Sequence, residues 1–156
     1  MRKALLLLVT SALLSATSCQ KEDDVRPTSY DALALGTGHW EWEKSTRGFS
    51  GNFTPATTGY TRQLVFGADG QLTVYRGSQP AYHTTYQLSM GQGRYCSLPG
   101  INVPFITYVS EAGLPNDDIK IYRISQSIKG EQTLSISGES SCVDGGAYET
   151  YRWVKE

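Results

Sequence analysis

Histidine is scarce in this chain of 156 residues, since His39 and His83 are the only two. A metal site or a Ser-His-Asp arrangement needs a histidine with an acidic or sulfur partner at a workable position. His83 alternates with Tyr82 and Thr84, so we expect it to face solvent, and His39 stands at the start of a strand. We therefore expect no catalytic site, no metal and no cofactor, and predict that the protein is not an enzyme.

Clusters of basic residues and long apolar segments are also missing beyond the N-terminus. The 14 Lys and Arg residues are balanced by 15 Asp and Glu residues, and no stretch is basic enough to suggest binding to nucleic acid. After the N-terminus, no segment is apolar for long enough to cross a membrane. The loop glycines Gly48, Gly51 and Gly59 are not part of a phosphate-cradling motif.

The N-terminus has the three zones of a secretory signal peptide. Arg2 and Lys3 are positively charged, Ala4–Leu14 is mainly apolar and too short to span a bilayer, and small residues follow. We predict that residues 1–18 are removed and that Cys19 becomes the lipid-bearing first residue.

The residues around Cys19 leave one alternative open. Ala16 and Ser18 also suit ordinary signal peptidase, which would give plain secretion. The run Gln20-Lys21-Glu22-Asp23-Asp24, however, resembles the acidic tag that follows the lipidated cysteine of surface-exposed lipoproteins in some Gram-negative bacteria. The resemblance implies an outer-membrane lipoprotein, held to the membrane by its N-terminal lipid and exposed on the cell surface.

The mature chain divides into a tether and one domain. Residues 19–37 are polar and contain Pro, Ser and Thr, so we expect a lipid-anchored flexible tether with one short turn near Tyr30–Leu35. From residue 38 to residue 156 the pattern is typical of β-structure. The expected strands are His39–Thr46, Tyr60–Phe66, Gln71–Arg76, Tyr82–Ser89, Pro104–Ser110, Asp118–Ile124, Gln132–Ser137 and Ala147–Lys155.

Apolar and polar residues alternate in several of these segments. The pairs expected to share the core face are Leu64 and Phe66, Leu72 and Val74, Ile119 and Ile121, and Leu134 and Ile136. A period of two with one apolar face indicates antiparallel strands around a single core. The fold class that we predict is all-β, an eight-stranded antiparallel up-and-down β-barrel, with a β-sandwich as the alternative.

Two motifs carry a family resemblance. Gly38-His39-Trp40 resembles the Gly-x-Trp signature of lipocalins, and Arg152 stands where lipocalin-like barrels supply an arginine that covers this tryptophan. Together with the Tyr151–Lys155 segment, these residues are similar to small lipocalin-like bacterial lipoproteins. The resemblance implies that Gly38, Trp40 and Arg152 close one end of the barrel, and Arg123 is a second candidate for the contact with Trp40.

Two cysteines remain if Cys19 carries lipid. Cys96 and Cys142 form an even pair in an oxidising compartment, so we expect a disulfide. Two free thiols or a metal site are the alternatives, although two cysteines with no nearby histidine make a poor zinc site.

The nearest thing to a binding site lies at the other end of the barrel. Counting outward from the turn around Asp69 places Arg62 opposite Arg76, both in phase with the core. Opposed like charges are unfavourable unless an anionic ligand group neutralises them. The alternative is that both side chains turn out into water at the rim or pair with Glu43 or Glu111. The loop between Arg47 and Gly59 would act as a mobile lid. The predicted ligand-binding residues are Arg62, Arg76, Phe49, Phe53, Trp42 and Tyr86.

Two classes of function follow from this. One is a barrel that binds a small apolar or anionic amphiphilic ligand, with its aromatic side chains lining the pocket. The other is a structural or protein-interaction module whose barrel is filled by side chains and whose protein partner is unknown. A large interior cavity favours the first and a solid core favours the second.

Lipidation is directly testable at Cys19. We expect the intact mass of the protein from the membrane fraction to include two or three acyl chains, because a single chain anchors only weakly. Cys19→Ala should move the protein out of the membrane fraction. A soluble wild-type product that begins at an unmodified Cys19 would contradict the prediction.

Overall fold

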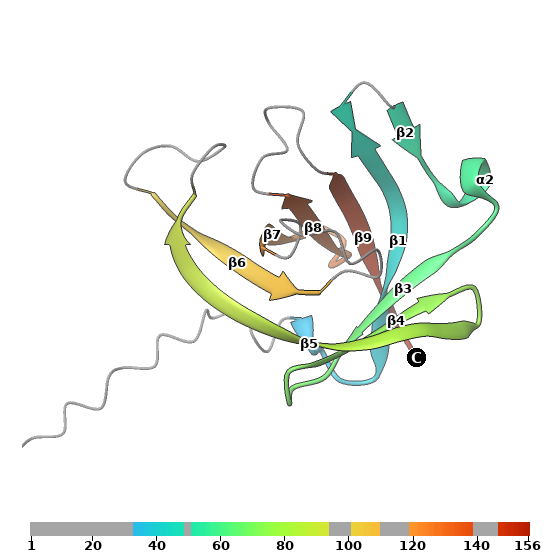
Figure 1. The fold of residues 1–156 in the computed structure, drawn as a ribbon. Coiled ribbons are helices and arrows are strands. Elements are labelled where there is room, and N and C mark those ends of the chain that lie inside the picture. The colour runs from blue at the N-terminus through green and yellow to red at the C-terminus, as the bar shows by residue number, and fades with distance from the viewer. Residues whose placement is uncertain (1–32, 49–50, 94–100, 110–118, 139–146) are drawn as a thin grey trace, which may run out of the picture.

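The computed structural model describes residues 33–48, 51–93, 101–109, 119–138 and 147–156, and its strands form one curved sheet (Figure 1). The elements are β1 (Gly38–Arg47), β2 (Gly51–Phe53), α2 (Pro55–Thr58), β3 (Arg62–Phe66), β4 (Gln71–Arg76), β5 (Gln79–Gln92), β6 (Asn102–Tyr108), β7 (Ile119–Gln126), β8 (Gln132–Gly138) and β9 (Tyr148–Lys155).

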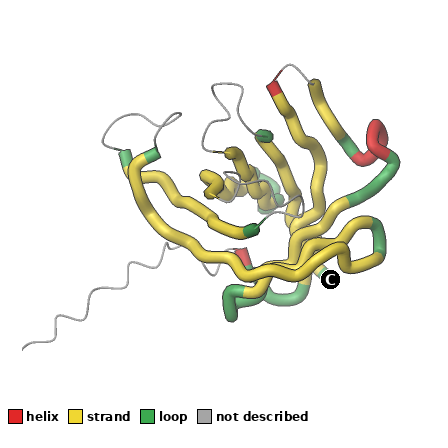
Figure 2. The backbone as a smooth tube through the Cα atoms, viewed as in Figure 1, coloured by secondary structure: helices red, strands yellow, loops and turns green. Residues whose placement is uncertain are grey.

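The sheet closes on itself because β1 pairs with β9 as well as with β3. Every pairing is antiparallel, and apart from β2 the strands follow one another around the barrel in chain order. The predicted up-and-down barrel is therefore confirmed, and the sandwich alternative is wrong. Closure satisfies the backbone edges that an open sheet would expose. Figure 2 shows how fully strands dominate the described chain.

The strand β2 was not predicted. After Glu41, β1 no longer pairs with β3, and its last residues, Ser45 to Arg47, pair instead with β2. The short helix α2 follows, with a capping box between Thr54 and Thr57 that satisfies the first free backbone N–H groups. Most of the segment expected to be a lid loop is thus regular structure, the strand β2 and the helix α2.

The turn between β3 and β4 sets the register of these two strands. The Asp69 carboxylate accepts the backbone N–H of Gln71 at 3.1 Å, and Gly70 adopts a φ of 81°, which favours glycine. The hairpin pairs Phe66 with Leu72 and, at its open end, Arg62 with Arg76. This is the register that the sequence predicted.

Alternation predicts the core correctly in three strands and fails in one. The buried residues include Leu64, Phe66, Leu72, Val74, Leu134 and Ile136, as expected. In β7, however, Ile119 is 46% exposed, whereas Lys120 and Tyr122 are buried. The predicted core face of β7 is therefore wrong, because Ile119 and Ile121 face outward and an inward lysine takes the place expected of an apolar side chain.

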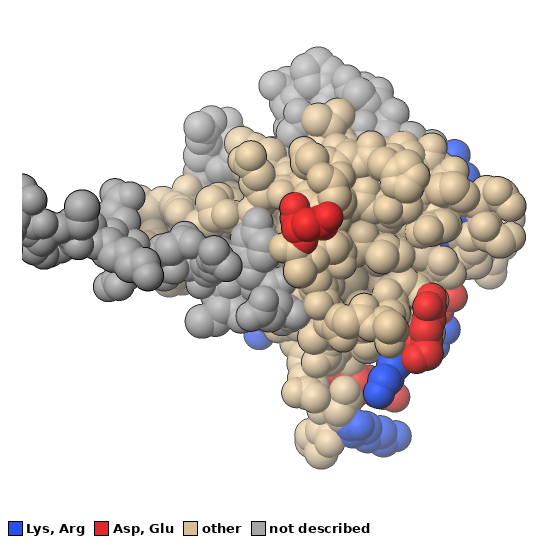
Figure 3. Space-filling model, turned by 90° about the horizontal axis from the view of Figure 1, so that it is seen from below, with Lys and Arg blue, Asp and Glu red and all other residues tan. Residues whose placement is uncertain are grey.

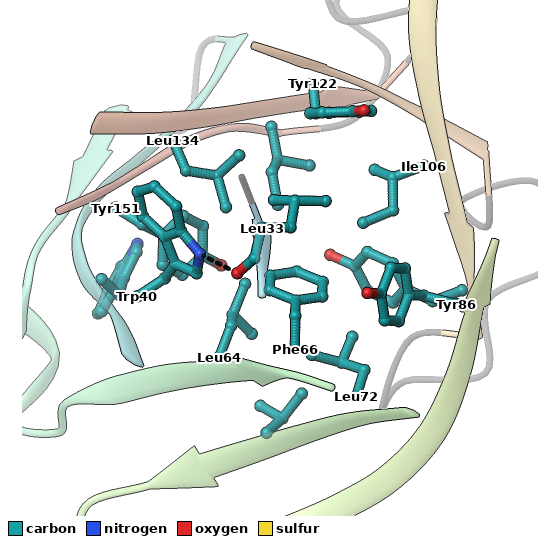
Figure 4. Packing of buried hydrophobic residues seen from close by; sticks show 14 residues of the cluster. Leu33, Trp40, Leu64, Phe66, Leu72, Tyr86, Ile106, Tyr122, Leu134 and Tyr151 are labelled. Carbon is teal, nitrogen blue, oxygen red and sulfur yellow. Dashed lines mark hydrogen bonds between the residues drawn. The ribbon is translucent and has the colours of Figure 1, made fainter. Parts of the chain in front are cut away.

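Leu33 fills one end of the barrel. It is completely buried, and its carbonyl oxygen accepts a hydrogen bond of 2.9 Å from the Trp40 indole Nε1. Figure 4 shows Leu33 in the middle of the buried cluster, between side chains from opposite walls. The Thr37 carbonyl also accepts the backbone N–H of Glu156. Leu33 and Ala34 thus pack on the core and Thr37 is bonded to the last residue, so the expected free tether up to residue 37 is wrong for this end of it.

Gly38 and Trp40 take part in closing this end, but Arg152 does not. A Cβ atom on Gly38 would lie 2.5 Å from the Trp153 ring, so only glycine lets this ring approach. Trp153 meets Trp40 edge to face, with 5.2 Å between ring centroids. Arg152 points outward and bonds through its Nε to Glu41 at 3.0 Å, because neighbouring residues in a strand face opposite sides. Arg123 is exposed, so the predicted arginine cover over Trp40 is wrong.

Replacing Trp40 tests this closure. Trp40→Ala should lower the free energy of unfolding by about 3–5 kcal/mol, because it empties core volume and leaves the buried Leu33 carbonyl without its donor. Arg152→Ala is the control and should cost at most about 1 kcal/mol, as expected for an exposed ion pair. Chemical denaturation measures both. A loss under about 1 kcal/mol for Trp40→Ala would place Trp40 outside the core.

Candidate functional site

Charged side chains meet where β3, β4 and β9 approach one another, away from the end that Leu33 fills. We call this set the charged mouth: Arg62 on β3, Arg76 on β4 and Glu149 on β9. Arg62 and Arg76 are register partners at the open end of their hairpin. Lys120 lies at the start of β7, and its Nζ is 4.4 Å from the centroid of the Tyr108 ring. Antiparallel topology brings the start of β3 and the end of β4 together, since each strand starts where its neighbour finishes.

Arg62 is neutralised by Glu149. The guanidinium Nη2 lies 2.6 Å from Glu149 Oε1, and both side chains are largely buried. The same carboxylate accepts the Tyr151 hydroxyl at 2.8 Å and the Ser45 hydroxyl at 3.3 Å. The sequence pointed to Glu43, Glu111 or a ligand as the neutralising group. Glu149 supplies it instead, from a strand whose sequence lies far from Arg62; Glu43 is exposed and residue 111 lies outside the described chain.

A bulge in β1 makes this network possible. The pairing with β9 shifts between Trp42 and Lys44, so that one extra residue, Glu43, interrupts the alternation. Trp42 and Ser45 consequently both lie inside the barrel, and the Trp42 Nε1 donates to the Ser45 hydroxyl at 2.9 Å. Strict alternation would have turned Ser45 outward and left the indole N–H unsatisfied.

Two arginines and three aromatic rings form a chain of contacts near the point where β1 leaves β3. Arg76 lies over Tyr60 at 4.9 Å, and Tyr60 stacks on Trp42 with an interplanar angle of 16°. Arg62 in turn lies over Trp42 at 5.1 Å and over Tyr151 at 5.4 Å. We call these five side chains the cation–aromatic ladder. Each desolvated contact of this kind contributes about 0.5–2 kcal/mol.

Burial and charge shift the pKa values of the network in opposite directions. Burial alone would lower the pKa of Arg62, but the neighbouring Tyr151 and Glu149 raise it above its ordinary value. Burial alone would raise the pKa of Glu149, yet the Arg62 charge and three hydrogen bonds hold it below 4.5. Burial and the Glu149 charge raise the pKa of Tyr151 well above 10.0. At neutral pH the network therefore consists of a cation, an anion and a neutral phenol.

The structure brings together only part of the predicted ligand site. Arg62, Arg76 and Trp42 meet in the ladder. Phe53 lies on β2 beneath Arg47, with 5.9 Å from the guanidinium to the ring centroid. Tyr86 lies toward the other end, where its hydroxyl donates to the Gly67 carbonyl and its ring meets Phe66. Three further predicted residues belong to stretches that the structure does not describe: Phe49, Cys96 and Cys142.

Sequence reasoning missed Lys120 and Glu149. Lys120 was missed because the isoleucines on either side of it suggested that their face of the strand was the core face. Glu149 was missed because it lies in the last strand, far in sequence from Arg62. The signal that could have found Glu149 is its spacing of two from Tyr151, which places both on one face of the strand. Within the described residues, no group of three His, Cys, Asp or Glu side chains could hold a metal ion.

The pH dependence of stability tests the ion pair. Near neutral pH, Glu149→Gln should lower the free energy of unfolding by about 2–4 kcal/mol, because it leaves the buried Arg62 charge without its counter-ion. Folding lowers the pKa of Glu149, so its stabilisation is complete above 4.5 and is lost as the pH falls through the folded value. The difference in the free energy of unfolding between the wild-type protein and Glu149→Gln should therefore become smaller in acid.

The exposed Glu43 on the same sheet provides a matched control. Glu43→Gln should change stability by less than about 0.5 kcal/mol at any pH in this range. Urea unfolding at a series of pH values measures all three proteins. If the difference in unfolding free energy between the wild-type protein and Glu149→Gln stays constant from neutral pH into acid, Glu149 is not an ionised carboxylate in the native state.

Comparison with known proteins gives no relative for this barrel. No protein-family model matches the chain, no curated protein matches it, and no solved structure matches it. The described residues contain no helix that is long and apolar enough to span a membrane.

Proposed function

We propose that this protein is an exported, non-enzymatic lipoprotein whose barrel binds the anionic group of a small amphiphilic molecule at its charged mouth. The observation that carries the proposal is the pairing of two arginines, Arg62 and Arg76, which are register partners at the open end of their hairpin. Both guanidinium groups lie against aromatic rings of the ladder, Arg62 over Trp42 and Arg76 over Tyr60.

The arrangement of the cations suits a carboxylate or phosphate. Guanidinium groups bind such anions through paired, charge-assisted hydrogen bonds. Arg62 already donates through Nη2 to Glu149, while its buried Nε has no hydrogen-bond partner. Arg76 is exposed at the end of β4, where an incoming anion meets it first. The rings of the ladder offer apolar contact to the first carbons of an aliphatic tail.

The depth of the site limits the ligand. Fourteen buried hydrophobic residues form one cluster that runs through the barrel to Leu33 (Figure 4). A long acyl chain would have to displace this core, at a cost that close-packed interiors resist. The favoured ligand therefore places only its head and a short tail in the mouth.

The proposed location depends on the N-terminus. The signal-like residues 1–18 and the acidic run after Cys19 support a lipid anchor on the outer membrane of a Gram-negative bacterium, with the barrel at the cell surface. Lipocalin-like kinship is part of the same proposal and is supported by Gly38, whose missing side chain admits the Trp153 ring beside Trp40.

The filled core also favours a second candidate, a protein-interaction module. A barrel with a solid interior presents only its loops and its outer faces to other molecules. Native mass spectrometry of the purified mature protein separates the two candidates. A co-purified small anion supports ligand binding, and a bound protein chain supports the interaction module.

Calorimetry with octanoate and octyl phosphate tests the ligand proposal. Arg76→Ala should weaken binding by about tenfold, since the loss of one charge-assisted contact costs about 1.5 kcal/mol. Arg123→Ala removes the same charge from an exposed outer position of β7 and should leave the affinity unchanged. The double variant Arg62→Ala, Arg76→Ala should abolish binding.

The free energy of unfolding has to be measured on the same samples, because Arg62→Ala leaves the buried Glu149 carboxylate without its counter-ion. If the wild-type protein binds neither compound, or if Arg76→Ala and Arg123→Ala bind equally well, the charged mouth is not an anion site.

A further inference from the structure

The outer surface of the lower barrel wall is uncharged. The strands β3, β4 and β5 contain only two residues with a full charge, Arg62 and Arg76, and both lie in phase with the core. The outward positions carry amides, hydroxyls and rings: Gln63, Val65, Thr73, Tyr75, His83, Thr85, Gln87 and Ser89. Figure 3 shows the molecule from below, where most of the described surface is uncharged, apart from one acidic group near the middle of the view and charged side chains toward one edge.

An open cleft of about 810 Å³ runs along this wall, within the size range of small-molecule sites. It lies on the opposite side of the sheet from the charged mouth, because Gln63 and Tyr75 alternate with the inward Arg62 and Arg76. One side of the cleft is formed by Thr61, Gln63, Val65, Tyr75, Gly77 and Ser78. The other side is formed by Gly36, Thr37, Gly38, His39 and Glu156.

The chemistry of this lining is that of groups which both donate and accept hydrogen bonds. An amide side chain offers two donors and a carbonyl acceptor, and each hydroxyl offers one donor and two lone pairs. Gln63 and Tyr75 are direct register partners, so an amide and an aromatic ring lie side by side on one surface. The carboxylate of Glu156 lies 3.6 Å from the His39 ring, at the rim.

This combination matches the chemistry of a neutral sugar. A sugar ring presents hydroxyl groups that donate and accept in the same way, together with C–H groups that pack on an aromatic face. An anionic ligand would find no lysine or arginine among the lining residues. A peptide that adds to a sheet needs an unpaired strand edge, and β4 is paired on both sides, with β3 and β5.

We infer that the outer cleft between the β3–β4 wall and the chain ends is a second binding site, and that it takes a neutral carbohydrate chain. Tyr75 provides the aromatic platform, and Gln63, Thr61 and Ser78 bind hydroxyl groups. The open shape of the cleft suits a chain that passes along the wall. The site shares no residue with the charged mouth, so the two proposals stand or fall separately.

Titration with neutral trisaccharides tests the inference on the intact mature protein. Maltotriose, cellotriose, mannotriose and chitotriose are added in turn, and binding is followed through the backbone amide NMR signals. We expect at least one of them to shift the signals of Gln63, Tyr75 and Ser78. Tyr75→Ala should weaken this binding by more than about tenfold, and Tyr75→Phe should retain most of it.

Tyr148→Ala is the matched control, because Tyr148 is an exposed tyrosine on β9 that does not line the cleft. It should bind the sugar as the wild-type protein does. Three results would overturn the inference: no shift with any of the four sugars, equal affinity in Tyr75→Ala and Tyr148→Ala, or binding only of a trigalacturonate included as an anionic comparison.

Discussion

The Trp40 indole joins the chain that enters the barrel to the walls of the barrel itself. Its N–H reaches the Leu33 carbonyl, and its ring packs against Trp153 from the last strand. The beginning and the end of the described chain therefore meet at one buried side chain. A barrel needs such a plug, because the inward side chains at its ends have neighbours on only one side. Once this end is filled and dry, polar groups that have to be buried are confined to the other end.

At that other end, the structure buries charge at a cost. Desolvating Arg62 and Glu149 is unfavourable, and their attraction offsets the cost only because Tyr151, Ser45 and the surrounding rings satisfy the pair. A hydrophobic pair of similar volume would often serve stability as well or better. The network also needs an irregular β1, since the bulge beside Trp42 turns Ser45 inward. We therefore interpret the buried ion pair as part of the proposed binding site rather than as a feature that stabilises the core.

Local patterns predicted those features of this barrel that depend only on neighbours in sequence. The hairpin from Arg62 to Arg76 follows from one turn and a period of two, and the structure has this register. The pattern failed at β7, because Ile119 and Ile121 are more apolar than Lys120, and only the closed barrel shows which face is inside. Glu149 and Leu33 were missed for a related reason. Each takes its place through a contact with a residue far away or on another element, which no local period encodes.

The two faces of the β3–β5 wall show a separation of chemistry. Inside, the wall carries its only two full charges, at the mouth. Outside, it presents hydroxyls, amides and rings. Solubility does not require this, since an outer face normally carries lysine and glutamate, and such charges also keep a sheet surface from sticking to others. An outer wall without charged side chains is less well protected against association with other sheets. The cleft beside Tyr75 gives it a physical reason, because charged side chains hold water tightly and would compete with a neutral ligand for every hydrogen bond along the wall.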